Sequence, residues 1–158
     1  MFSKARISVA AAALVAMTGV GFAASHAQSE FAREIAARQS QMKIYEFNLL
    51  VLGAMAKGDA PYDVEAATLA ANNLVAANSI WMPSAWPKGS DNASADGTRA
   101  LPAIWDNFPD VGAKAQGVKQ ALAEMQTAAG TDIDAIRDAL GKVGAACTAC
   151  HKSYRAAE

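Results

Sequence analysis

The stretch Cys147-Thr148-Ala149-Cys150-His151 lies near the C-terminus of this 158-residue chain and decides what the rest of it must fold around. Two cysteines separated by two residues and followed directly by a histidine form the motif of covalent c-type haem attachment. The thiols add to the vinyl groups of haem as thioethers, and the histidine is placed to bind the iron. We therefore predict one covalent haem c, attached through Cys147 and Cys150, with His151 as an axial iron ligand.

Other uses of the motif are less consistent with its surroundings. A thioredoxin-like dithiol belongs to a βαβ pattern, and no strand-like segment precedes Cys147. A structural zinc site takes about four ligands, whereas the chain after its N-terminal segment holds two cysteines and one histidine. A disulfide would not require the adjacent histidine. A helical bundle without haem, with a disulfide or dithiol at Cys147 and Cys150, stays as an alternative hypothesis.

The first 27 residues have the pattern of a secretory signal peptide. A short basic region precedes an apolar, alanine-rich run at 7–22, and small residues precede Gln28. We predict that residues 1–27 are cleaved and that 28–158 form one domain. Because the apolar run is shorter than the ~20 residues of a membrane-spanning helix, we expect no stable membrane insertion. Haem c is attached outside the bacterial inner membrane, so we expect the protein in the periplasm.

The charge balance bears on the partners of the predicted mature chain. Without residues 1–27 the sequence holds 12 basic and 15 acidic residues. It has no basic run and no aromatic residues interleaved with lysine and arginine, which argues against nucleic-acid binding. A modest net charge suits a protein that meets redox partner proteins transiently.

The composition of the mature chain predicts an all-α fold. Alanine, leucine, methionine, glutamine and lysine, which favour helices, are abundant. The predicted helices span 29–57, 61–81, 99–129 and 131–156. Pro109 must kink or restart the third helix, and Thr131 with Asp134 has the spacing of a capping box at the fourth. A long loop at 82–98 and two short connections favour an antiparallel up-down-up-down four-helix bundle, with haem near the C-terminal end of the last helix.

The second axial ligand is expected to be a methionine, because the predicted mature chain has no second histidine. In this topology the first helix begins, and the second ends, near the haem motif. Met42 lies in the first half of the first helix, on its apolar stripe, whereas Met55 and Met125 lie at the far end. Met82 is near but in a loop. Topology favours Met42, and ordinary core packing of Met42 remains the other interpretation.

The chain also resembles the cytochrome c′ family, the class II cytochromes c. The resemblance covers the mature chain. It is carried by the residues at 147–155, 38–42, 51–58, 61–63 and 104–105. It implies thioethers at Cys147 and Cys150, proximal ligation by His151 and distal ligation by Met42, as in the low-spin branch of the family. Other members have a residue at the Met42 position that does not bind iron; they are high-spin and admit NO or CO.

Further site residues follow from the resemblance and from helical spacing. Arg38 and Gln39 match positions that contact haem, and Arg99 is a candidate for the same role. Arg155 lies one turn beyond His151, where it either contacts haem or complements the helix dipole as a solvated cation. The resemblance also implies a homodimer formed through the first two helices.

These observations predict a periplasmic electron-transfer protein rather than an enzyme. Two axial ligands that stay bound in both oxidation states minimise reorganisation, and a thioether ligand raises the reduction potential. No acid–base pair for substrate conversion is evident. The alternative function is binding of NO or CO, as in the high-spin members of the family.

Overall fold

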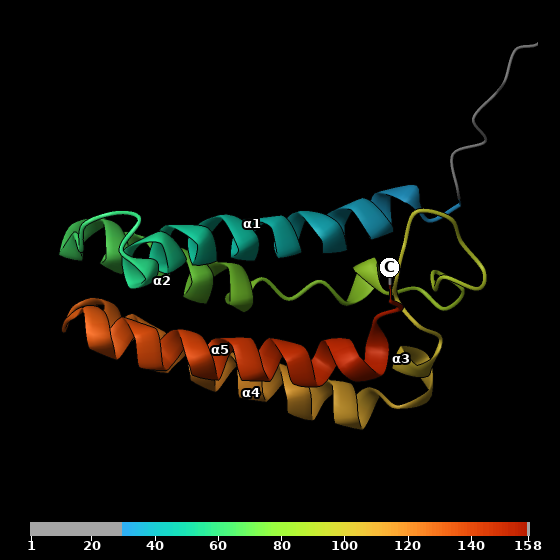
Figure 1. Cartoon of the computed structure of the whole chain (residues 1–158). Helices are drawn as coiled ribbons and strands as arrows, with labels where there is room; N and C mark the ends of the chain where they lie inside the picture. Colours follow the sequence, from blue (N-terminus) through green and yellow to red (C-terminus); the bar gives the residue numbers. More distant parts are fainter. Residues whose placement is uncertain (1–29, 158) are drawn as a thin grey trace, which may run out of the picture.

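The computed structural model describes residues 30–157, so the predicted signal peptide lies outside it (Figure 1). The helices are α1 (Ala32–Lys57), α2 (Val64–Ser79), the 3-10 turn η1 (Pro83–Ala85), α3 (Ala103–Asp106), α4 (Phe108–Ala129) and α5 (Ile133–Tyr154). Within 30–157 the only β-type pairing is an isolated antiparallel bridge between Ala100 and Arg155. The all-α prediction is therefore confirmed. No helix in this range is long and apolar enough to cross a membrane.

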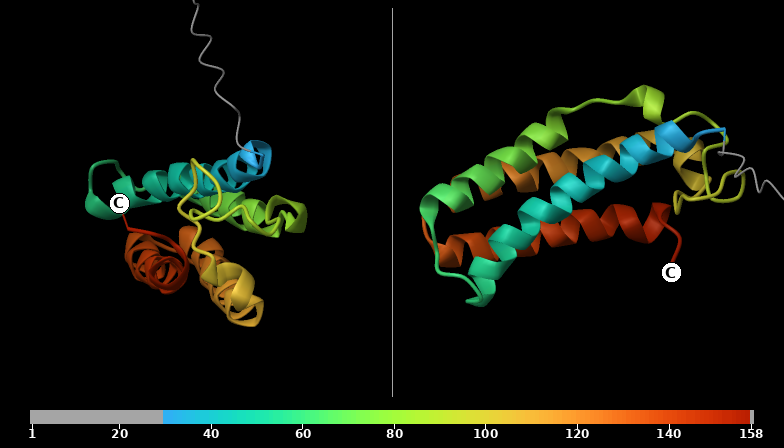
Figure 2. Two further views of the ribbon diagram at one scale, coloured as in Figure 1. Left: turned by 90° about the vertical axis from the view of Figure 1, so that its right-hand side faces the viewer. Right: turned by 90° about the horizontal axis from the view of Figure 1, so that it is seen from above.

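The four long helices form an antiparallel bundle in which each packs against two others. The neighbours are α1 with α2, α2 with α4, α4 with α5, and α5 with α1. Short connections join α1 to α2 and α4 to α5, while a long excursion carries the chain from α2 to α4 (Figure 2). The beginning of α1 and the end of α5 consequently lie at the same end of the bundle, beside that excursion (Figure 1).

The core receives one fully buried large side chain from each long helix. Leu52, Leu74, Met125 and Ile136 have no exposed surface. Alanines of α2 and α4, including Ala67, fill the space between these side chains and let the helices approach closely. This core occupies the middle and far end of the bundle, and Cys147 of the motif packs against it. Met125, which the topology placed at the end far from the haem motif, is a core residue.

The third predicted helix is divided at Asn107. α3 ends at Asp106, and α4 begins at Phe108 with Asn107 as its N-cap, whose side chain accepts from the Asp110 backbone N–H at 3.4 Å. Pro109 occupies the first turn of α4, where its missing N–H leaves no helical hydrogen bond unmade. The expectation that Pro109 kinks or restarts this helix is thus confirmed as a restart.

The predicted capping box at the start of α5 is wrong. Asp132, not Thr131, is the N-cap, and its carboxylate accepts from the Ala135 backbone N–H at 2.9 Å. The Thr131 hydroxyl instead donates to the Thr127 carbonyl at the end of α4 (3.1 Å). Because the connection between the two helices is short, the Thr131 side chain bonds to the end of α4 rather than to the start of α5.

Backbone hydrogen bonds tie the long excursion to the C-terminal end of α5. The Leu101 N–H donates to the Tyr154 carbonyl at 3.0 Å, and the Ala156 N–H donates to the Arg99 carbonyl at 2.8 Å. These bonds hold residues 99–101 alongside residues 154–156. The segment just beyond the cysteine motif is therefore braced by a part of the chain more than fifty residues earlier.

Candidate haem-binding site

The motif residues lie on one side of α5, near its C-terminal end. Cys147, Cys150 and His151 are related as i, i+3 and i+4, so helical geometry puts them on one face. All three are half-buried, and both cysteines are free thiols. Burial raises the pKa of each thiol above its ordinary value. The face that the sequence predicted to look into the bundle does so.

His151 lies in a basic environment. Its pKa is lowered from the ordinary value, first by burial and then by the positive charges of Arg155 and Arg99. A lowered pKa favours the neutral imidazole, which is the form that binds metal ions. Beside the imidazole is a pocket of about 380 Å³. It is lined by Arg99, Thr148, His151, Lys152, Arg155, Ala156 and Ala157.

The register between α1 and α5 brings Met42 to the level of His151. Tyr45 of α1 and Cys147 of α5 both pack against the core, and they are close enough to interact electrostatically: burial raises the pKa of Tyr45 to about 12, and Cys147 adds to this shift. Met42 is one turn from Tyr45 toward the start of α1, and His151 is one turn from Cys147 toward the end of α5. Because the two helices are antiparallel neighbours, both steps lead toward the same end of the bundle.

Met42 is exposed on the apolar stripe of α1, beside the half-buried Tyr45 and Leu49. Ile35, Arg38 and Leu52, at heptad-like spacing along the same stripe, are buried, whereas Met42 is 46% exposed. A large apolar side chain exposed in line with buried ones marks a place where the polypeptide leaves a surface uncovered. A group lying between α1 and α5 would cover it. The other candidates differ: Met55 is buried in the core, and Met82 is half-buried in a loop.

Arg38 is a buried cation beside this surface, with 6% of its area exposed. Its guanidinium donates to the Ser90 hydroxyl at 3.0 Å and to the Ser90 carbonyl at 2.9 Å. It also lies over the ring of Trp86, at 4.6 Å from the centroid. Burial lowers the pKa of Arg38, and the charge of Glu34 partly offsets this effect. A desolvated guanidinium of this kind favours a carboxylate ligand.

The remaining predicted residues occupy the rim. The exposed Gln39 side chain donates to the Gly97 carbonyl at 2.7 Å, which ties α1 to the long loop. The Arg99 guanidinium donates to the Ala156 carbonyl from two nitrogens, at 2.9 and 2.6 Å. Arg155 is exposed at the end of α5. Arg99 and Arg155 thus lie beside His151, while Arg38 and Gln39 of α1 bond to the long loop.

Comparisons with known proteins agree with this arrangement. A sequence model described as "Cytochrome C′" matches residues 33–155. The chain belongs to the cytochrome c′ family. It is 44% identical over 123 residues to cytochrome c-554 of Cereibacter sphaeroides, covering 78% of this chain and 80% of that protein. It matches the structure of a cytochrome c′ from Rhodobacter spheriodes with a TM-score of 0.79 and 30% identity, over 82% and 99% of the two chains.

A second solved cytochrome c′ is described as having an unusual ligand-controlled dimer dissociation. It matches with a TM-score of 0.70 and 28% identity, over 79% of this chain and 95% of its own. These comparisons identify the fold as the cytochrome c′ four-helix bundle and the chain as a haem protein that binds one covalent haem c.

The residues present suit that cofactor. Two half-buried thiols flank a helical turn, a histidine follows with its imidazole biased toward the neutral form, and an uncovered methionine lies at its level on α1. A buried guanidinium is available for a propionate. This donor set combines thiols for attachment, an imidazole for iron and a cation for carboxylate, which suits a c-type haem.

The sequence analysis did not identify three residues beside this cytochrome c′ site, namely Ser90, Asp110 and Tyr154. Ser90 holds Arg38, and the buried Tyr154 hydroxyl donates to the Asp110 carboxylate at 2.6 Å. Tyr154 is four residues after Cys150, so helical spacing could have indicated that it shares the inward face. Ser90 and Asp110 had no such signal, because their partners lie 52 and 44 residues away in the sequence.

Proposed function

We propose that this cytochrome c′-family protein carries single electrons between partner proteins, with its haem iron bound by His151 and Met42. When bound, haem c supplies an iron that alternates between Fe(III) and Fe(II). The feature that most supports this proposal is the Met42 side chain, which is exposed on the apolar stripe of α1 and, by helical register, lies near the level of His151. A thioether ligand raises the reduction potential relative to more basic ligands.

Each residue of the site would have a separate role in holding the haem. Cys147 and Cys150 anchor the group, His151 binds from α5 and Met42 from α1. Because the two ligands belong to helices braced against each other, their positions change little between oxidation states, which keeps reorganisation small. The groups around His151 are arginine and lysine side chains rather than a carboxylate–histidine pair, so we propose a carrier rather than an enzyme.

The test is an optical spectrum of the haem-loaded protein, oxidised, reduced, and reduced under CO, compared with that of Met42→Leu. Leucine keeps the apolar volume but offers no sulfur. We expect the wild type to be low-spin and unchanged by CO, and the variant to become high-spin and bind CO. The matched control is Met82→Leu, which should behave as the wild type does.

Two results would contradict the ligand assignment. A low-spin spectrum retained in Met42→Leu would show that another group binds the iron, and loss of that spectrum in Met82→Leu would identify Met82. A wild-type protein that is already high-spin and binds CO rapidly would instead support the second candidate function.

That second candidate is binding of a small gas such as NO or CO. It is favoured by the exposure of Met42, because a side chain with few packing contacts is easily displaced. A relative described by ligand-controlled dimer dissociation supports ligand binding in this family. The CO spectrum of the wild type decides between the two functions.

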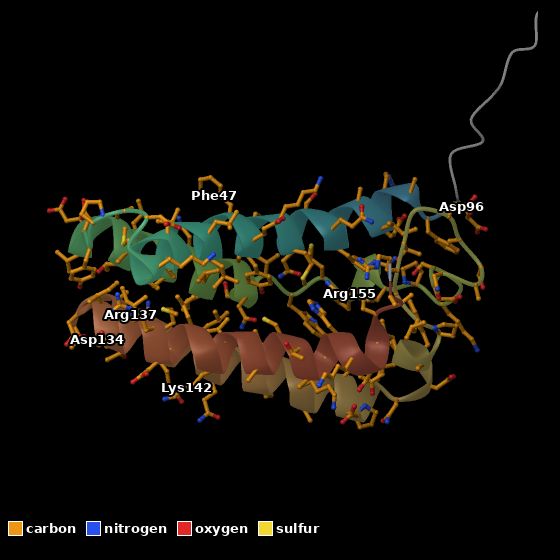
Figure 3. All side chains as sticks on the ribbon, viewed as in Figure 1. Phe47, Asp96, Asp134, Arg137, Lys142 and Arg155 are labelled. Carbon is orange, nitrogen blue, oxygen red and sulfur yellow. The ribbon has the colours of Figure 1, made fainter. Side chains whose placement is uncertain are left out.

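We also propose that a second copy of the chain covers the outer face of α1 and α2. Ile44, Phe47 and Leu50 on α1, and Leu69 on α2, are largely exposed, and Phe47 points away from the bundle (Figure 3). Exposed apolar surface extending over adjacent helices is typical of protein interfaces. The dimeric state of a solved relative supports a homodimer. Phe47→Glu should convert a dimer to a monomer in light scattering, whereas Lys43→Glu should not.

We propose that the protein is exported to the periplasm with removal of residues 1–27. The signal-peptide pattern of those residues and the haem attachment motif support this location. N-terminal sequencing of the mature protein should begin at Gln28. A mature protein that retains Met1 would contradict cleavage.

A further inference from the structure

A hydrogen-bonded cluster joins α4 to the last turn of α5, on the side of the motif away from α1. The Tyr154 hydroxyl donates to one Asp110 carboxylate oxygen at 2.6 Å, and the Lys114 ammonium lies 3.0 Å from the same carboxylate. Tyr154 is buried, and the side chains of Lys114 and Asp110 are 23% and 40% exposed. The cluster is therefore a partly sheltered ion pair whose acidic member is fixed by a buried phenol.

The cluster lies beside a thioether-forming cysteine. Tyr154 follows Cys150 by four residues and so occupies the neighbouring position on the same face of α5. Through Tyr154 the Asp110 carboxylate, and with it the Lys114 ammonium, is held about one helical turn from Cys150, whose sulfur attaches the haem. The Glu124–Lys142 pair also joins α4 to α5, but Lys142 lies about two helical turns before Cys150.

We propose that Asp110 and Lys114 set the reduction potential of the haem from the α4 side, with Tyr154 as the positioning residue that holds the Asp110 carboxylate. A negative charge near the iron stabilises Fe(III), and a positive charge stabilises Fe(II). In a partly buried site these effects are screened less than at the surface. With both charges present, their effects on the reduction potential largely cancel. Asp110 alone would lower the potential, and Lys114 alone would raise it.

The experiment measures the midpoint potential of the haem-loaded protein for four variants. Asp110→Asn leaves Lys114 unbalanced and should raise the potential. Lys114→Gln leaves Asp110 unbalanced and should lower it. We expect each single change to alter the ratio of oxidised to reduced protein at a fixed potential about threefold, which is roughly 28 mV for one electron. The double variant should return close to the wild-type value, and Tyr154→Phe should shift the potential while leaving the haem attached.

The matched control is the Glu124–Lys142 pair, whose acid is as exposed as Asp110 but whose lysine is 62% exposed and points away from the bundle (Figure 3). Glu124→Gln and Lys142→Gln should leave the potential unchanged. Shifts of the same sign in Asp110→Asn and Lys114→Gln, or shifts no larger than in these controls, would overturn the proposal. A merely structural role of the cluster would give shifts of the same sign, because either change breaks the same contact.

This inference rests on the proposed function only through the attached haem. It does not require Met42 to be the ligand, because a high-spin haem also has a measurable Fe(III)/Fe(II) potential. The optical spectrum of each variant is recorded with its potential. A spectrum that shows no Met42 ligation together with opposite shifts in the two single variants would reject the ligand assignment and keep the charge-pair assignment.

Discussion

Arg38 is a buried cation whose hydrogen bonds go to a single loop residue, Ser90. At the scale of single residues we predict that Arg38→Gln lowers the free energy of unfolding of the haem-loaded protein by about 1.5–3 kcal/mol, the range for hydrogen bonds to charged groups. Urea denaturation followed by circular dichroism measures this. Arg33→Gln is the control, because Arg33 is 91% exposed and its loss should change stability by less than about 0.5 kcal/mol.

The Tyr154–Asp110 bond makes stability depend on pH in a defined direction. The pKa of Asp110 is lowered from 3.8, first by the Tyr154 hydrogen bond and then by Lys114. A lowered folded-state pKa means that the stabilisation is present above pH 3.8 and is lost as the pH falls through the folded value. Asp110→Asn should therefore remove part of the acid-induced loss seen in the wild type. Equal acid sensitivity of the two proteins in thermal unfolding between pH 2 and 6 would contradict this.

Alkaline pH tests the other partner of the same bond. The pKa of Tyr154 is raised from 10.0 to about 12, chiefly by the hydrogen bond to Asp110. Its stabilisation is present below pH 10.0 and is lost as the pH rises toward 12. Tyr154→Phe should lack this alkaline component in the same thermal unfolding experiment. Tyr62→Phe is the control, because the Tyr62 hydroxyl donates to a backbone carbonyl, that of Ala129.

Single residues also mark the limit of sequence analysis at the site. The attachment motif identified the cofactor because its chemistry is local: thiols and imidazole follow each other within one helical turn. The burial of Arg38 could not be predicted, since it depends on a serine 52 residues away. The exposure of Met42 could not be predicted either, because helical periodicity places it on the apolar stripe without showing how much of its side chain the other helices cover.

The helix termini give the clearest prediction at the scale of elements. Asp132→Ala removes the N-cap of α5 and should lower the free energy of unfolding by about 1 kcal/mol. Thr131→Ala, the neighbouring change, should cost less than about 0.5 kcal/mol because the hydroxyl lies outside the helix start. Urea denaturation compares the two. A larger cost for Thr131→Ala than for Asp132→Ala would restore the capping box that the sequence suggested.

Helix identities were predictable and helix boundaries were not, for local reasons. Alanine-rich composition and apolar spacing indicated the helices at 29–57 and 131–156, and the structure shortens them by only a few residues at their ends. Pro109 indicated a break in the third helix, but the break lies at Asn107, because asparagine can cap the new helix while proline occupies its first turn. Which of several adjacent residues caps a helix depends on the path of the chain before it, and the sequence does not show that path.

At the scale of the whole molecule, stability depends on the core shared by the four long helices. Leu74 on α2 is fully buried, whereas Leu69 on the same helix is 63% exposed. Leu74→Ala should lower the free energy of unfolding by about 2–5 kcal/mol. Leu69→Ala should leave the stability of the monomer nearly unchanged and weaken self-association. Denaturation at low protein concentration and sedimentation at high concentration separate these effects.

The bundle topology was predictable from the positions of its short and long connections. Two short connections make α1 antiparallel to α2 and α4 antiparallel to α5. The long loop between α2 and α4 still places these two helices side by side, so helices consecutive in the sequence are neighbours in the bundle. The bracing of residues 99–101 against 154–156 was not predictable, since it consists of backbone bonds that carry no residue signature.

That brace also has a consequence for the order of biogenesis. The attachment cysteines and the residues that close over them belong to the last part of the chain to be synthesised, so α1, α2 and α4 exist before the haem motif emerges. Once residues 99–101 are fastened to 154–156 and α5 packs its half-buried thiols against α1, access to those thiols becomes narrow. Covalent loading, which is irreversible, therefore competes with closure of the C-terminal end, which is a folding step held by hydrogen bonds and packing.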